Sequence, residues 1–179
     1  MTHREQITAL FKDVATRHPL IRHTDDLKIP RFYEMEWEEM LQSGSGVAAV
    51  NWTLVLEEYV EEFRDNNGGY ISLNPNVAFL VGKHVKQGDK AAKAAAFLEA
   101  RAIAHNIIGK FQEHDRLGCN ADLPAGVKAP ANVDINTLRI QPIRLPYFDH
   151  AFGVRVSIKI RTDQEELFSG DEVEWLSLT

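Results

Sequence analysis

The clearest pattern in the chain is a strict alternation of apolar and polar side chains over residues 152–161. Side chains of a strand point alternately to its two faces, so this pattern predicts a strand with one buried and one exposed face. Residues 133–145 are its expected hairpin partner. Their apolar phase shifts between Ile135 and Leu138, which predicts a bulge, and Pro142 predicts an edge position.

The first helix is predicted near the start of the chain. Thr2 and Glu5 have the spacing of a capping box, in which a hydroxyl and a carboxylate each bind a backbone N–H left unpaired by the first turn. Apolar residues then recur at intervals of three and four up to Val14, and Pro19 follows. We therefore expect a helix over about residues 3–17, with one face on the core.

The longest helix is predicted in the middle of the chain, from Gly88-Asp89 to about Asp115. Asp89 is a favourable N-cap residue. Five alanines within residues 91–96 would let this helix approach its neighbour closely. Its predicted buried face consists of Phe97, Ala100, Ala104, Ile107, Ile108 and Phe111. Residues 117–132 are rich in Gly, Pro and Asn, so we expect a loop there.

Two apolar segments precede this long helix. The first half of residues 47–63 has strand-forming residue types, whereas the second half places Leu56, Tyr59, Val60 and Phe63 at helical spacing. Periodicity does not decide between the two. We favour a strand to about Leu56 followed by an acidic arm, for which a helix stays open. Residues 77–85 include an apolar run without alternation, which is typical of a central strand buried on both faces.

The order of these elements is helix, strands, long helix, strand hairpin and tail. It predicts an α+β fold, in which a mixed, largely antiparallel sheet carries an N-terminal helix and one long central helix packed on it. No repeat or linker interrupts residues 1–162, so we assign them to a single domain. Residues 163–179 form an acidic C-terminal tail.

Composition narrows the class of protein. A chain of 179 residues with 44% hydrophobic and 26% charged residues is ordinary for one globular domain. The net charge of −6 argues against nucleic acid or anionic lipid as the main partner. The start is polar and no apolar run approaches the length of a membrane span, so we expect neither a signal peptide nor a membrane partner. The single cysteine, Cys119, allows no intramolecular disulfide, and we expect a cytoplasmic protein.

Residues with catalytic or metal-binding chemistry lack the patterns that such sites require. No two of the seven histidines have the i, i+4 spacing that lets one helix face hold a metal. Cys119 lies near His114 and Arg116, which would favour a reactive thiolate, but an unreactive loop cysteine is far more common. The glutamate pairs within residues 57–62 are typical of a solvated face. We expect no enzyme activity, no metal and no cofactor.

Opposite charges gather on different segments of the chain. Such segregation allows head-to-tail pairing between copies. We give equal weight to an alternative in which the acidic tail folds back on the basic strand of its own chain. Trp175 in the tail more often covers the core of its own chain, but such a terminus can also dock on a neighbour. The predicted assembly interface comprises Arg139, Arg144, Arg155, Lys159, Arg161, Glu57, Glu58, Glu61, Glu62 and Trp175.

One family shares this layout. The features are the strand-like Trp52–Glu57, the acidic stretch to Asp65–Gly69, the apolar Ala78–Gly82, the helix Lys90–His114 and the strand Ala151–Ile160. Together they cover about residues 1–162, and in order and type they resemble the small tail-terminator and tail-completion proteins of phages and prophage-like contractile systems. The resemblance carries over no catalytic residue.

That resemblance implies a structural subunit that associates with its own copies into a ring capping a tail tube. Tail-tube or head-completion proteins are its implied partners. A small cytoplasmic ligand-binding or enzymatic module is the alternative. It predicts a concave pocket with convergent polar groups near Cys119 and His114.

Overall fold

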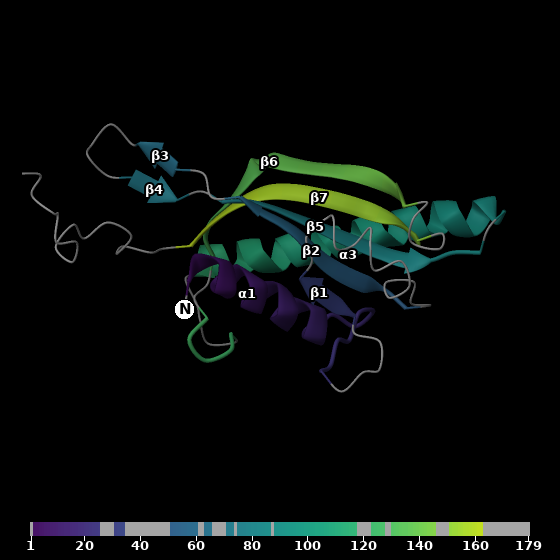
Figure 1. Ribbon diagram of the computed structural model, residues 1–179, viewed down its shortest axis with the longest axis horizontal. Helices are drawn as coiled ribbons and strands as arrows, with labels where there is room; N and C mark the ends of the chain where they lie inside the picture. Colours follow the sequence, from purple (N-terminus) through teal and green to yellow (C-terminus); the bar gives the residue numbers. More distant parts are fainter. Residues whose placement is uncertain are drawn as a thin grey trace, which may run out of the picture.

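The computed structural model describes residues 2–25, 31–34, 51–60, 63–65, 71–73, 75–86, 88–117, 123–127, 130–145 and 151–162. Figure 1 shows the arrangement of the elements. In chain order they are α1 (His3–Arg17), β1 (Phe32–Glu34), β2 (Thr53–Val60), β3 (Phe63–Asp65), β4 (Ile71–Leu73), β5 (Asn76–His84), α3 (Lys90–Leu117), β6 (Pro130–Leu145) and β7 (Ala151–Thr162).

Five of the strands form one sheet in the order β1-β2-β5-β7-β6, while β3 and β4 form a separate antiparallel pair. β1 runs parallel to β2, and the other neighbours in the large sheet are antiparallel. This arrangement confirms the predicted α+β fold with a mixed, largely antiparallel sheet. The predicted tail, residues 163–179, lies outside the described residues.

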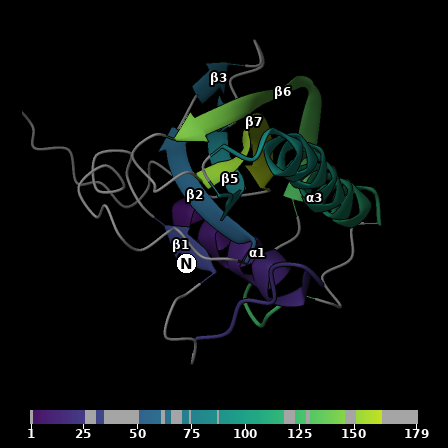
Figure 2. The same ribbon diagram turned by 90° about the vertical axis from the view of Figure 1, so that its right-hand side faces the viewer.

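The core lies between one face of the large sheet and the two helices. α3 packs on β5, β6 and β7, whereas α1 packs on β1 and β2 (Figures 1 and 2). Phe11 of α1 connects these layers, because its ring centroid lies 5.0 Å from that of Phe79 in β5 and 5.0 Å from that of Phe111 in α3. All three rings are fully buried. Both predicted helices therefore cover the same face of the sheet.

The first helix has the predicted bounds and cap. The Glu5 backbone N–H donates to Thr2 Oγ1 at 3.2 Å, and the Thr2 N–H donates to Glu5 Oε2 at 2.7 Å. These two bonds complete the capping box over the first turn. The helix ends at Arg17, and His18 follows as the C-cap in an extended conformation.

The long helix begins one residue after the predicted cap. The Ala92 backbone N–H donates to Asp89 Oδ1 at 2.8 Å, which confirms Asp89 as the residue that caps its start. The predicted buried face is buried except for Phe97, which is half-buried. The expected role of the alanines is only partly correct: Ala96 is buried, but Ala91, Ala94 and Ala95 are exposed. Most of that alanine run therefore faces away from the sheet.

The helical interpretation of the residues after Leu56 is wrong for the described residues up to Val60. β2 continues to Val60, and Glu58, Tyr59 and Val60 pair with successive residues of β5. The register shifts between Leu56 and Glu58, which marks a bulge. The helix-like spacing of the apolar residues arises because this bulge resets which face each side chain occupies.

The other strand predictions are largely confirmed. β5 lies at the centre of the sheet, and both Phe79 on the helix side and Leu80 on the opposite side are buried. β6 is an edge strand that contains Pro142, and its register against β7 shifts between Asp134 and Arg139. β6 begins at Pro130, so the predicted loop over residues 117–132 is too long at its end.

Burial at the end of α1 makes one histidine sensitive to pH. His18 is buried and its Nδ1 accepts a hydrogen bond from the Leu20 backbone N–H at 3.3 Å, an acceptor role that only the neutral ring can fill on that nitrogen. Burial lowers the pKa of His18 below its ordinary value of 6.5. The unfolded chain therefore binds this proton more readily than the folded one.

We expect the free energy of unfolding to contain a contribution from His18 that is fully present above about pH 6.5, the pKa in the unfolded chain, and is lost as the pH falls through the lower pKa of the folded chain. Urea titrations between about pH 7.5 and pH 5.5 measure it. The variant His18→Gln should show a flatter dependence on pH than the natural chain. His105→Gln, which changes an exposed histidine of α3, is the control and should keep the natural slope. Equal slopes in all three proteins would contradict the prediction.

Candidate functional site

Three residues of the predicted assembly interface meet on the sheet face opposite the helices. Nε of Arg155 lies 2.6 Å from Glu57 Oε2, and its second guanidinium nitrogen lies 2.9 Å from Glu58 Oε2. The Glu57 side chain is only 6% exposed, whereas that of Arg155 is 31% exposed. Burial makes the guanidinium the partner on which this carboxylate depends. The pairing joins β7 to β2 across β5 within one chain.

This cluster changes how the charge segregation is interpreted. Here the positive charge of β7 is neutralised by carboxylates of β2 in the same chain. The residues involved are ones that we predicted to make contacts between copies. A substitution of Arg155 by Glu would place a third carboxylate beside Glu57 and Glu58 and would therefore disturb the fold. Arg155 is consequently a poor position for testing assembly alone.

Of the remaining predicted interface residues, the structure describes the side chains of only two. Lys159 lies on the same face of β7 as Arg155 and is half-buried. Its backbone N–H donates to Thr137 Oγ1 at 2.9 Å. Arg139 is exposed on the edge strand β6, opposite Ser157. Arg144 and Arg161 lie in β6 and β7, but their side chains are outside the described part. Glu61, Glu62 and Trp175 are also outside the described residues.

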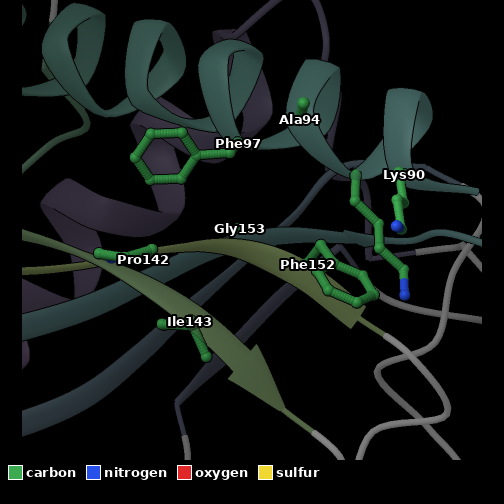
Figure 3. Close-up of a pocket in the computed structure, with 8 residues that line it drawn as sticks. Lys90, Ala94, Phe97, Pro142, Ile143, Phe152 and Gly153 are labelled. Atoms are coloured by element: carbon green, nitrogen blue, oxygen red, sulfur yellow. The ribbon is translucent and has the colours of Figure 1, made fainter.

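A groove of about 560 Å³ lies where α3 begins, between the helix and the end of the sheet at which β7 starts. Figure 3 shows the rings of Phe97 and Phe152 in the space between helix and strands. Its walls are formed by Lys90, Lys93, Ala94 and Phe97 of α3, by Pro142 and Ile143 of β6, and by Phe152 and Gly153 of β7. This volume is within the range of binding sites for small molecules.

The groove combines apolar walls with positive charge. Nζ of Lys93 lies 4.6 Å from the centre of the Phe152 ring, in the geometry of a cation–π contact. Lys90 is the first residue of α3 and follows Asp89, whose carboxylate binds the Ala92 backbone N–H. This chemistry suits a ligand that joins carboxylates to an aromatic or aliphatic group.

An apolar stripe continues from the groove over the outside of α3. Ala91, Ala94, Ala95 and Leu98 are exposed, and Leu98 has 64% of its surface exposed. Residues at these intervals lie along one side of a helix. A contiguous exposed apolar surface beside a groove is typical of a surface that contacts another polypeptide.

The groove was not among the features predicted from the sequence. Phe97 was assigned to the buried face and Phe152 to the buried side of its strand, but both are half-buried at the rim of that core. The available signal was the pair Lys90 and Lys93 at the start of an otherwise alanine-rich helix. The sequence does not show that β6 and β7 lie against the first turn of this helix.

Other site chemistry is limited to what the described residues allow. Among them, no three side chains of the types His, Cys, Asp and Glu come together in a way that would hold a metal ion. No helix in the same residues has the length and apolarity needed to cross a membrane. His114 is buried near the other end of α3 from the groove, and Cys119 lies outside the described residues.

Comparisons of the chain with protein-family models, with curated proteins and with solved structures find no similar protein.

Proposed function

We propose that this chain is a non-enzymatic structural subunit that associates with its own copies, as tail-terminator proteins do when they form a ring on the tube of a phage-like tail. The proposed partners are further copies of the chain, with tail-tube or head-completion proteins at the ends of the ring. The proposal rests on the resemblance in layout and on the exposed edge of β6.

The edge strand β6 is the observation that carries this proposal. β6 spans Pro130–Leu145 and pairs with β7 on one side, and within the described residues no strand pairs with its other side. An edge of this length offers unpaired backbone donors and acceptors to another chain. Ile135 is 41% exposed on the same strand, so an apolar side chain accompanies the unpaired backbone.

Two features of β6 would make such pairing selective. Pro142 has no backbone N–H, and the bulge between Asp134 and Arg139 interrupts the regular ladder. Both features prevent pairing along the whole strand in an arbitrary register. A defined contact between copies is therefore favoured over open-ended aggregation.

Arg139 provides the test of this edge. We expect the natural chain to run as one discrete multi-subunit species in size-exclusion chromatography with light scattering. Its association should weaken at high salt, because salt screens the surface charges. The variant Arg139→Glu should weaken association about tenfold or more, since it reverses the charge at the centre of the proposed contact. Its circular dichroism spectrum should not change.

The matched control is Arg116→Glu, which makes the same charge change at an exposed position of α3. It should keep the mass of the natural chain. A natural chain that is monomeric at every concentration and salt would contradict self-association. Equal loss of mass in both variants would show an effect of net charge and would contradict the role of the β6 edge.

A second candidate function is a small binding module, and the groove at the start of α3 favours it. Its lysines and phenylalanines suit an anionic aromatic molecule. A thermal shift produced by such compounds and removed by Lys93→Glu, in a chain that stays monomeric, would support this candidate over the structural subunit.

A further inference from the structure

The groove and the exit of the chain from the sheet lie at opposite ends of the molecule. β7 begins beside the groove, with Phe152 as one of its walls, and runs along the sheet to Thr162 (Figure 1). A strand rises by about 3.3 Å per residue, so these two residues are about 33 Å apart. Each copy therefore presents a groove at one end and releases its C-terminal segment at the other.

The chemistry of that C-terminal segment is complementary to the groove. Residues 163–179 contain no lysine or arginine. Acidic and apolar side chains are interspersed in it: Asp163, Glu165, Glu166, Asp171, Glu172 and Glu174 with Leu167, Phe168, Val173, Trp175, Leu176 and Leu178. The groove offers Lys90 and Lys93 for the carboxylates, and the rings of Phe97 and Phe152 for an aromatic anchor.

We propose that residues 163–179 of one copy dock in the α3 groove of the next copy. Trp175 occupies the space between Phe97 and Phe152, and Glu172 and Glu174 face Lys90 and Lys93. This inference rests on the proposed self-association and names its second contact surface. Such a contact joins two different surfaces, so repeating it produces a closed ring or a filament.

Chain length favours docking between copies over docking within one chain. An extended chain covers about 3.3 Å per residue, so Phe168 reaches about 20 Å from Thr162, well short of the groove about 33 Å away. Trp175 reaches about 43 Å from Thr162. Within one chain it therefore reaches the groove only if the segment runs back along the sheet almost straight. A neighbouring copy placed head to tail brings the groove close to Thr162 and removes this restriction.

Reciprocal charge reversal in full-length chains tests the inference. The groove variant carries Lys90→Glu and Lys93→Glu, and the tail variant carries Glu172→Lys and Glu174→Lys. Each variant alone should associate at least tenfold more weakly than the natural chain, because like charges then face each other in every contact. Mixed in equal amounts, they should regain the mass of the natural chain, since every groove meets a tail of opposite charge.

The control reverses two basic residues elsewhere on the same helix, Arg101→Glu and Arg116→Glu, and should keep the natural mass. The circular dichroism spectrum of each variant, which should match that of the natural chain, separates loss of association from loss of the fold. Light scattering after size exclusion, at several protein concentrations, is the readout for all variants and mixtures.

The possible results separate this inference from the proposed function. A natural oligomer whose mass neither reversal changes overturns the docking of tail and groove and leaves self-association through β6 in place. Loss of mass in both variants without recovery on mixing overturns the pairing of these two surfaces. A monomeric natural chain overturns self-association itself, and with it docking between copies.

Discussion

Replacing Gly153 with alanine is expected to lower the free energy of unfolding by about 3 kcal/mol or more. A Cβ atom at this position would overlap the carbonyl oxygen of Val81, and it would lie 2.7 Å from the Gly82 Cα and 2.8 Å from the Val81 carbonyl carbon. These atoms belong to the backbone of the central strand β5, which cannot move aside as a flexible side chain could. The register of β5 and β7 must therefore distort.

Thermal unfolding measures this effect, and a loss of about 3 kcal/mol lowers the melting temperature by roughly 6–12 °C in a chain of this size. Gly109→Ala is the matched control. Gly109 is an exposed residue inside α3, and a Cβ atom there meets nothing within 4 Å. Alanine is the better helix former by roughly 0.5–1 kcal/mol, so this variant should melt higher than the natural chain. A Gly153→Ala variant as stable as the natural chain would contradict the close strand approach.

Replacing Phe11 with alanine should cost about 3–5 kcal/mol, since it leaves a cavity where α1, β5 and α3 meet. The Phe11 ring is fully buried against Phe79 and Phe111, so few other side chains can fill the space. Chemical denaturation with urea measures the loss. Phe11→Leu keeps most of the volume and should cost clearly less.

The exposed Leu98 provides a control, because its truncation to alanine also removes an apolar side chain but leaves no buried cavity. It lies on the outside of α3 with 64% of its surface exposed, and Leu98→Ala should change stability by less than about 0.5 kcal/mol. If Phe11→Ala were as mild as Leu98→Ala, α1 would not be held on the sheet by this ring cluster.

Elements whose signals are local could be predicted from the sequence. The capping box of Thr2 and Glu5 acts within one turn, and the alternation over residues 152–161 reflects a strand with one buried face. The end of β2 could not be predicted in this way. There the apolar spacing resembled a helix, and pairing with β5, which lies further along the chain, decides the conformation.

The candidate sites depend even more on distant residues. Arg155 binds Glu57 across 98 positions of sequence, so opposite charges that looked separate along the chain are neighbours in space. The groove likewise needs β6 and β7 beside the first turn of α3. The sequence revealed that charge is unevenly distributed, but only the topology shows which charges neutralise each other and which remain exposed at an edge or a groove.

The position of β7 in the sheet has a consequence for how the protein is made. β7 is the last described strand along the chain, yet it lies between β5 and β6. During synthesis, β5 therefore lacks its second partner until the chain up to Thr162 has left the ribosome, and until then the backbone groups along one of its edges stay unpaired. Chains released early, without β7, should be the aggregation-prone species, and binding of a chaperone to nascent chains should peak after β5 emerges and fall once β7 is complete.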